Sequence, residues 1–350
     1  MIGNISHIRF DYRPTAFNLG LNRAFRSGGS GAVSGAICPR FPDDKVPGKK
    51  GVYTILAPLT DFNPDAEGGM SKVYLALDPE DYQCVLKVMI DISGFLPGPA
   101  KEITLRFVEE VNTTERVNHK NVIGIIDREP SRVPEYYFME YVPENLRNFI
   151  EEKEQAKPLA ASHIILRILR GLIAFSNAFG ADSPDKCAHR DLKPENIFIE
   201  RDEDGKSIIK VKVADFGLVK VPDSEKTRTG MITATPEYCA PEIILNGSKI
   251  ADQRSDIFVL GLILYYLLTG KDALDLGENK RDFKAYLDQV RTLPERIKNR
   301  EFGELKHPVP DEFWNIALKA AQMEPNDRFQ SFQEFSGAVE AAIKKFTIKR

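Results

Sequence analysis

The chain has 350 residues, of which 42% are hydrophobic, enough to bury a substantial core and too many for an intrinsically disordered protein. Its formal net charge of −3 gives no global attraction to nucleic acid or to an anionic membrane surface. The four cysteines are too sparse for a disulfide scaffold and too widely spaced for a zinc site. We therefore expect a globular cytoplasmic protein with reduced thiols and no nucleic-acid partner.

The apolar stretches of the sequence are short for a membrane protein. The N-terminal MIGNISHIRF lacks the apolar core of a signal peptide. The longest apolar run, IFVLGLILYYLL at 257–268, has twelve residues, too few to cross a bilayer. We expect this run to form a buried core helix, and we expect no membrane segment in this chain.

The first 50 residues differ in composition from the rest. They carry eight Lys or Arg residues against three Asp, a balance of +5. The stretch RSGGSGAVSGA at 26–36 is rich in Gly and Ser, which is typical of a flexible linker. We expect residues 1–50 to form a basic N-terminal extension. Two interpretations stay open: a disordered extension, and a regulatory segment that docks on the folded domain or on a partner.

Beyond residue 50, strand patterns come first, in VYTILAPL, KVYLALD and QCVLKVMI. The segment 99–117 then has the pattern of a helix, with Pro99 near its first turn, and further strands follow in NVIGIID and YYFMEYV. From about residue 145 the pattern turns helical. This order predicts an α+β chain in which a hinge near 140–144 joins a small β-rich lobe with one key helix to a larger α-helical lobe.

The most specific signal is HRDLKPENIFI at 189–199, followed by ADFG at 214–217 and APE at 240–242. In this order and spacing, the motifs resemble those of the eukaryotic-like (Hanks-type) Ser/Thr protein kinases. EGGMSKVYLA and a Thr-x-Thr between the last two motifs are most similar to the bacterial branch. The resemblance covers residues 51–345 and implies the two-lobed protein kinase fold, with an N-lobe at 51–142 and a C-lobe at 143–345.

The resemblance implies that four residues of these motifs carry phosphoryl transfer. Asp191 would be the base that orients the substrate hydroxyl, and Lys193 would reach the γ-phosphate. Asn196 and Asp215 would supply the oxygen ligands that Mg²⁺ prefers. The segment between these two ligands has the pattern of a hairpin that turns at 204–205, which would bring them together.

Lys87 in CVLK matches the strand lysine that holds the α- and β-phosphates in this family. Its ion-pair partner is expected on the helix that follows. Glu110 shares one face of that helix with Phe107 and Thr114, at spacings of three and four residues, whereas Glu109 is rotated off this face. We therefore predict a pair between Lys87 and Glu110. The long loop before the helix indicates that the helix moves between in and out positions.

The resemblance also implies an ATP site with Mg²⁺, or Mn²⁺ in its place. The backbone of Glu140 and Val142 would bond adenine, with Met139 as gatekeeper. The loop DAEGGMSKVYLA at 65–76 keeps Gly68 and Gly69, where the backbone must approach the phosphates most closely, which favours a working loop over a degraded one. Apolar contacts to the adenine ring are expected from Val73, Val85 and Phe198.

The segment from 215 to 242 has the features of a regulated activation segment. Thr227 and Thr229 lie where bacterial relatives are phosphorylated, and a phosphate there would pair with Arg190 and order the segment. The resemblance implies structural roles for three more residues, an ion pair of Glu242 with Arg328 and a brace of the catalytic loop by Asp256.

The leading hypothesis is an active Ser/Thr protein kinase that transfers the γ-phosphoryl group of Mg-ATP to protein hydroxyls and to its own activation segment. The alternative is a pseudokinase that binds nucleotide and acts as a scaffold, supported only by the thin glycine loop. A small-molecule kinase is disfavoured because APE and Lys193 are both present. The sequence does not identify the protein substrate or the oligomeric state.

Overall fold

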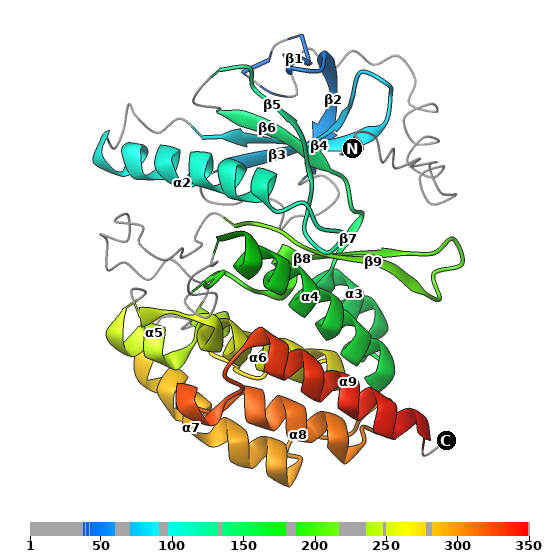
Figure 1. The fold of residues 1–350 in the computed structure, drawn as a ribbon, viewed down its shortest axis with the longest axis vertical. Helices are drawn as coiled ribbons and strands as arrows, with labels where there is room; N and C mark the ends of the chain where they lie inside the picture. Colours follow the sequence, from blue (N-terminus) through cyan, green and yellow to red (C-terminus); the bar gives the residue numbers. More distant parts are fainter. Residues whose placement is uncertain are drawn as a thin grey trace, which may run out of the picture.

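A computed structural model shows a small lobe built on a sheet, stacked on a larger helical lobe along the long axis of Figure 1. The structure describes residues 38, 40–41, 43–59, 71–90, 97–131, 135–179, 187–216, 236–247, 250–277 and 282–348. This α+β architecture of two lobes agrees with the fold that the motifs predicted, and the lobes follow one another in the predicted order.

The small lobe is an antiparallel sheet in the order β1-β2-β3-β4-β6-β5. Its strands are β1 (Lys45–Pro47), β2 (Val52–Pro58), β3 (Ser71–Leu77), β4 (Gln83–Met89), β5 (Ile125–Arg128) and β6 (Tyr136–Glu140). Alternate side chains of β2 are buried, as expected for a strand with one face on a core, and Tyr53 stacks on Phe138 with ring centroids 3.6 Å apart.

The small lobe includes the end of the basic N-terminal extension. β1 pairs with β2, and the hydroxyl of Tyr136 donates to the backbone oxygen of Pro47 at 2.8 Å. Ahead of β1, the ring of Phe41 packs edge-on against Tyr136, with centroids 5.3 Å apart. The boundary expected at residue 51 therefore falls inside the β1–β2 hairpin. Residues 1–37 lie outside the described part of the chain.

Helix α2 (Pro97–Arg116) corresponds to the helix predicted at 99–117 and begins two residues earlier. It lies alongside the small-lobe sheet in Figure 1. Phe107 and Val111 of α2 form an apolar cluster with Tyr137 of β6, so this face of the helix is fixed against the sheet. Near the end of α2, Glu115 forms an ion pair with Arg128 of β5 at 3.0 Å.

A second sheet, in the order β7-β8-β9, lies at the junction of the lobes. Its strands are β7 (Glu144–Asn145), β8 (Ile197–Arg201) and β9 (Ile208–Val213). β8 and β9 form the predicted hairpin, and Gly205 in its turn has a φ of +70°, a conformation that glycine adopts without strain. The hairpin connects Asn196 to Ala214 and Asp215.

The large lobe is helical. Its helices are α3 (Leu146–Lys153), α4 (Pro158–Phe179), α5 (Pro241–Asn246), α6 (Gln253–Thr269), α7 (Phe283–Asn299), α8 (Asp311–Ala320) and α9 (Phe332–Ile348), with short 3-10 turns η4 (Pro194–Asn196), η5 (Pro236–Tyr238) and η7 (Pro325–Asp327). Every residue of α6 except Arg254 is buried, which confirms that the run at 257–268 is a core helix. The side chain of Asp252 caps its first turn.

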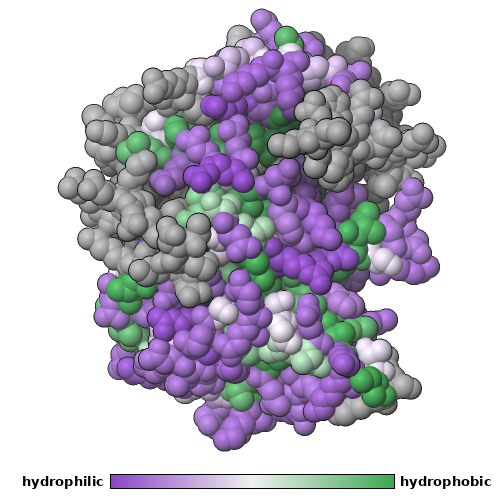
Figure 2. Space-filling model, viewed as in Figure 1, coloured by the Kyte–Doolittle hydropathy of each residue, from purple (hydrophilic) through white to green (hydrophobic). Residues whose placement is uncertain are grey.

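Among the described residues, α4 alone is long and apolar enough to cross a membrane by length and composition. About three fifths of its apolar window (61%) is buried inside the protein, and α4 contacts α6, α9 and β9. A helix packed in this way fits the core of the large lobe. Among the coloured residues on the face shown in Figure 2, hydrophilic residues predominate and hydrophobic residues form separate patches.

Candidate active site

Lys87 and Glu110 meet where α2 packs on the sheet. The Lys87 Nζ lies 2.6 Å from Oε1 of Glu110 and 3.6 Å from Oδ1 of Asp215. Glu110 carries this ion pair rather than its neighbour Glu109, in line with the helical spacing. Burial alone would lower the pKa of Lys87, but the charges of Asp215 and Glu110 outweigh it and raise that pKa well above its usual range. Lys87 therefore carries a positive charge at neutral pH, at the junction of the two lobes.

Tyr137 also belongs to this group, and the sequence interpretation missed it. Its hydroxyl donates to Oε1 of Glu110 at 2.6 Å, and it lies directly opposite Lys87 in the pairing of β4 with β6. Partners in an antiparallel pair point to the same side of the sheet. The alternation of YYFME places Tyr137 and Met139 on one face, but only the register shows that Lys87 shares it.

The catalytic loop brings Asp191, Lys193 and Asn196 together. The Asn196 amide nitrogen donates to the backbone oxygen of Asp191 at 2.8 Å and to its Oδ2 at 3.2 Å. The Lys193 Nζ lies 3.8 Å from the same Oδ2. Burial raises the pKa of Asp191 to about 7, although Lys193 pulls it down. A carboxylate with a pKa near neutrality is suited to accept a proton from a hydroxyl.

The buried carboxylate of Asp256 holds the loop that carries Asp191 through two hydrogen bonds to its backbone. Oδ2 of Asp256 in α6 accepts from the backbone N–H of His189 at 2.6 Å, and its Oδ1 accepts from that of Arg190 at 3.1 Å. Arg190 has a φ of +69°, in the left-handed region that costs a non-glycine residue energy. The two hydrogen bonds to Asp256 hold this conformation and so place Asp191.

Asp215 is held next to the catalytic loop. The backbone N–H of Ala214, one residue before it, donates to the backbone oxygen of Asn196 at 3.0 Å. Asp215 itself has a φ of +66°. Burial disfavours its carboxylate, but Lys87 and other nearby bases lower the pKa of Asp215. An anionic carboxylate and an amide oxygen thus come from neighbouring backbone segments, as the predicted hairpin implied.

The apolar residues expected around adenine come from both lobes. Val73, Val85 and Met139 share one face of the small-lobe sheet, with Val85 directly opposite Met139. Met139 and Phe198 pack against a buried cluster that includes Val142. The structure therefore brings the gatekeeper, the hinge and β8 together at the lobe junction.

At the hinge, only one of the two backbone hydrogen-bonding groups of Glu140 can bind a ligand, because the other is already paired. Its N–H donates to the oxygen of Gly124 at 3.0 Å, which leaves the carbonyl as the group that could meet adenine. Its side chain is held by a second residue that the sequence interpretation missed. Lys212 of β9 lies with its Nζ 2.6 Å from Oε1 of Glu140 and 3.2 Å from the backbone oxygen of Val122. Lys212 thus ties the hinge to the strand that leads to Asp215.

Four of the predicted site residues lie outside the described part of the chain, namely Gly68, Gly69, Thr227 and Thr229. Their roles stay predictions. Ser71, which follows the glycine loop, is the first residue of β3 and is buried.

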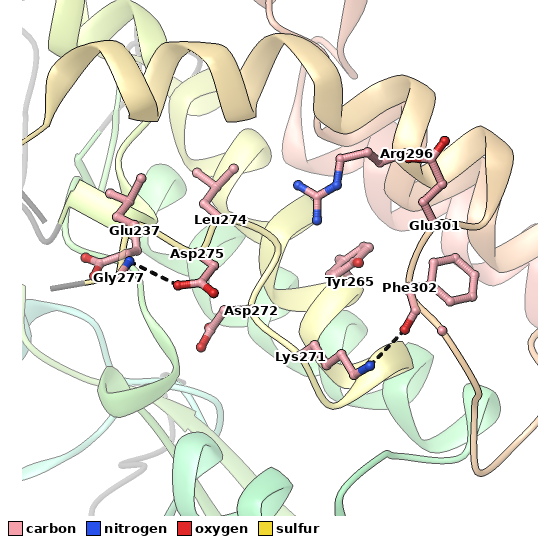
Figure 3. A pocket seen from close by; sticks show the side chains of 12 residues that line it. Glu237, Tyr265, Lys271, Asp272, Leu274, Asp275, Gly277, Arg296, Glu301 and Phe302 are labelled. Carbon is pink, nitrogen blue, oxygen red and sulfur yellow. Dashed lines mark hydrogen bonds between the residues drawn. The ribbon is translucent and has the colours of Figure 1, made fainter. Parts of the chain in front are cut away.

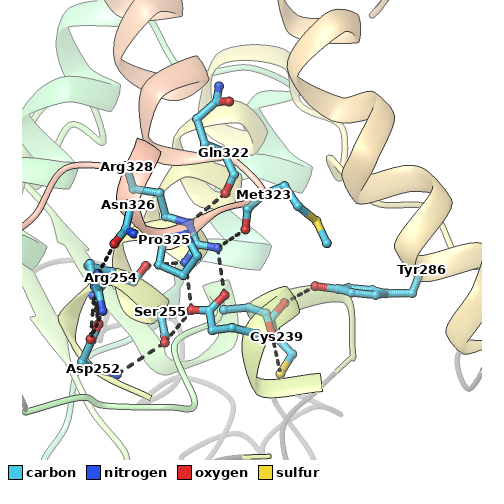
Figure 4. A network of polar contacts seen from close by, with 12 residues as sticks. Cys239, Asp252, Arg254, Ser255, Tyr286, Gln322, Met323, Pro325, Asn326 and Arg328 are labelled. Carbon is cyan, nitrogen blue, oxygen red and sulfur yellow. Dashed lines mark hydrogen bonds and ion pairs between the residues drawn. The ribbon is translucent and has the colours of Figure 1, made fainter. Parts of the chain in front are cut away.

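The predicted anchor of the activation segment is present. Arg328 donates to both carboxylate oxygens of Glu242, at 2.9 and 2.8 Å, and is 1% exposed. Figure 4 shows the guanidinium of Arg328 among the backbone oxygens of Gln322 and Met323 and the polar groups of α6. Bidentate geometry of this kind fixes orientation as well as distance.

A cavity of about 600 Å³ lies in the large lobe, apart from the predicted site residues. Figure 3 shows it between Tyr265 of α6, Arg296 of α7 and the loop that carries Lys271 and Asp272. Both cations are engaged by backbone oxygens, Lys271 by Phe302 at 3.0 Å and Arg296 by Ala273 at 3.1 Å. The nucleotide residues predicted from the motifs do not line this cavity.

Comparison with known proteins agrees with the geometry. The protein kinase domain family matches residues 66–338. The serine/threonine-protein kinase pkn3 of Myxococcus xanthus is 36% identical over 286 residues, which is 80% of this chain and 49% of that protein. PknL of Mycobacterium tuberculosis is 35% identical over 81% of this chain and 65% of its own length, and PrkC of Bacillus subtilis is 29% identical over 81% and 41%.

The chain belongs to the protein kinase family, and the three relatives named above are bacterial serine/threonine-protein kinases. It spans about two fifths to two thirds of the length of these three relatives.

Proposed function

We propose that this chain is an active, ATP-dependent Ser/Thr protein kinase that transfers the γ-phosphoryl group to protein hydroxyls. One observation carries the proposal: the charged and polar side chains needed for the reaction form two groups of contacting residues at the lobe junction. Lys87 joins Glu110 and Asp215 from the small-lobe side, and Asn196 and Lys193 contact Asp191 from the large-lobe side. A scaffold has no need of such a set.

The residues present fit a divalent cation. Asn196 turns its amide nitrogen toward Asp191, so that the amide oxygen points away from that carboxylate. The lowered pKa of Asp215, due to Lys87 and its other basic neighbours against the effect of burial, keeps this carboxylate anionic. Mg²⁺ prefers such oxygen ligands, together with phosphate oxygens. When bound, the ion would neutralise charge on the transferred phosphoryl group. We propose that Asn196 and Asp215 hold it.

The other residues of the site bind and orient the reactants. Lys87 would hold the α- and β-phosphates, with Glu110 fixing its ammonium group. Asp191 would accept the proton of the substrate hydroxyl, and its pKa of about 7 suits that task. Lys193 would neutralise the γ-phosphate. Because most of the catalysis in phosphoryl transfer comes from positioning and electrostatics, these fixed charges supply the chemistry that the reaction needs.

We further propose that the kinase phosphorylates itself on Thr227 or Thr229 and works in the cytoplasm. Buried Nε and Nη2 atoms of Arg190 make no hydrogen bond within the described residues, so this guanidinium is suited to receive a phosphate. The four cysteines are buried free thiols, which fits a reducing compartment.

The test is transfer of label from γ-labelled ATP, with Mg²⁺, to a generic protein substrate. The wild-type chain should transfer phosphate, and Asp191→Asn should reduce the rate by about 10²–10⁴-fold. The variant should still bind nucleotide, because Asp191 does not contact Lys87 or the hinge in the contacts described above. Nucleotide binding without transfer by the wild type would favour the pseudokinase alternative. Phosphate on a small metabolite alone would favour a small-molecule kinase.

A further inference from the structure

We infer that the phenol of Tyr137 is a positioning residue that holds Glu110, and with it α2, in the orientation in which Glu110 engages Lys87. Two donors converge on one oxygen: the Tyr137 hydroxyl and the Lys87 ammonium each lie 2.6 Å from Oε1 of Glu110. Both Tyr137 and Glu110 are buried, at 3% and 5% exposure. This contact is therefore not shared with bulk water.

The pairing of β4 with β6 explains why Lys87 and Tyr137 together orient the Glu110 carboxylate better than Lys87 alone. Lys87 in β4 and Tyr137 in β6 are direct partners, so their side chains leave the same face side by side. A lysine on a flexible stem fixes mainly the distance to a carboxylate. A phenol on a rigid ring adds a second, directional hydrogen bond from the neighbouring strand. Together they define where the Glu110 carboxylate lies.

The protonation state of Tyr137 suits this role. Burial and the nearby Glu110 carboxylate raise the pKa of Tyr137 well above its usual range. The phenol therefore keeps its proton at neutral pH and acts as a donor to Glu110.

Moving α2 away from the sheet would break this contact. Loss of Glu110 would leave the Tyr137 hydroxyl buried without the only partner that the described residues give it, which is unfavourable. The ring of Tyr137 also packs against Phe107 of α2, with centroids 5.4 Å apart. Removing only the hydroxyl keeps this packing, so a Tyr→Phe change isolates the hydrogen bond.

The chain offers a matched control one residue away. Tyr136 precedes Tyr137 on β6, points to the other face of the sheet, and donates to the backbone oxygen of Pro47 at 2.8 Å. Tyr136→Phe therefore removes the same atom, from the same strand, without touching Glu110. Losing a hydrogen bond to a charged group should lower kcat/KM for ATP about 10-fold in Tyr137→Phe. Tyr136→Phe should change it by less than about twofold.

A double-mutant cycle separates positioning from general damage to the fold. In a Glu110→Ala background the phenol has nothing left to hold, so Tyr137→Phe should add less than about a twofold loss. A second, equal 10-fold loss in that background would overturn the inference. So would equal activities of Tyr137→Phe and Tyr136→Phe in the wild-type background.

The inference rests on the proposed function, but one readout does not need activity. Hydrogen exchange of the α2 amides should become faster in Tyr137→Phe and stay as in the wild type in Tyr136→Phe. Unchanged exchange in Tyr137→Phe would overturn the inference even in an active kinase. Absence of phosphate transfer by the wild type, with faster exchange in Tyr137→Phe, would overturn the proposed function and leave the positioning role supported.

Discussion

The ion pair of Arg328 with Glu242 gives the sharpest prediction for stability. Arg328→Met keeps most of the side-chain volume but removes the guanidinium. Glu242 would then be a buried carboxylate that has lost both of its hydrogen bonds to Arg328 and keeps the 2.7 Å hydroxyl contact of Ser255. The backbone oxygens of Gln322, Met323 and Arg254 would lose a donor as well.

The magnitude follows from burial. Breaking a buried ion pair by removing one partner costs about 3–5 kcal/mol, because the other charge stays desolvated and unpaired. That is a large share of a total stability of about 5–15 kcal/mol. With a urea m-value of about 2–3 kcal/mol/M for a chain of this size, the unfolding midpoint of Arg328→Met should fall by about 1–2.5 M.

The control is an exposed pair in the same lobe. Lys298 and Glu295 lie 3.7 Å apart on α7, and their side chains are 66% and 67% exposed. Lys298→Met should lower the free energy of unfolding by less than about 0.5 kcal/mol. Both variants and the wild type are compared by urea denaturation followed by circular dichroism. A loss below about 1 kcal/mol in Arg328→Met would refute the reasoning.

Three further outcomes are expected. Burial lowers the pKa of His189 from 6.5 to about 4, so between these pH values the unfolded chain binds a proton that the folded chain does not. The free energy of unfolding should therefore fall by about 3 kcal/mol between pH 6.5 and pH 4. His189→Phe should reduce this pH dependence, as measured by urea denaturation at a series of pH values. Lys212→Met should raise KM for ATP by about 3- to 10-fold with a smaller change in kcat, because Oε1 of Glu140 at the hinge loses the Lys212 ammonium 2.6 Å away and keeps the backbone N–H of Gly124. Gly270→Ala should cost more than about 3 kcal/mol, because φ there is +72° and a Cβ would lie 1.5 Å from the backbone oxygen of Glu154.

Each of these has an outcome that would contradict it. An acid slope that persists in His189→Phe would show that other groups cause it. Lys210, on the same strand as Lys212, pairs with Glu200 away from the hinge, so Lys210→Met is the matched control. Equal KM values in the two lysine variants would contradict the role of Lys212. A wild-type melting temperature in Gly270→Ala would contradict the steric argument.

Local patterns were enough to predict much of this protein. The helical spacing that favoured Glu110 over Glu109 depends on neighbours within one helix, and the structure pairs Glu110 with Lys87. The hairpin between Asn196 and Asp215 and the core helix α6 follow in the same way from turn residues and an apolar run. These features depend on residues close together in the chain, so patterns within short sequence segments are enough to predict them.

The contacts that were missed depend on register between distant strands. Tyr137 reaches Glu110 only because β4 and β6 pair so that Tyr137 lies opposite Lys87. Lys212 reaches Glu140 from a strand in another sheet. A shift of one residue in the pairing of β4 with β6 would turn Tyr137 to the opposite face of its sheet, and the same shift between β8 and β9 would turn Lys212 away from Glu140. A short window of sequence does not specify the register between distant strands. β1 was missed because three residues form a strand only against the edge of β2.

Phosphate transfer by the groups around Asp191 is the central claim, and mass spectrometry of the protein after incubation with Mg-ATP tests it most directly. The wild-type chain should gain phosphate on Thr227 or Thr229, and Asp191→Asn should gain none on the same timescale. An unmodified wild-type chain that binds nucleotide and also transfers no phosphate to an added protein would contradict the account.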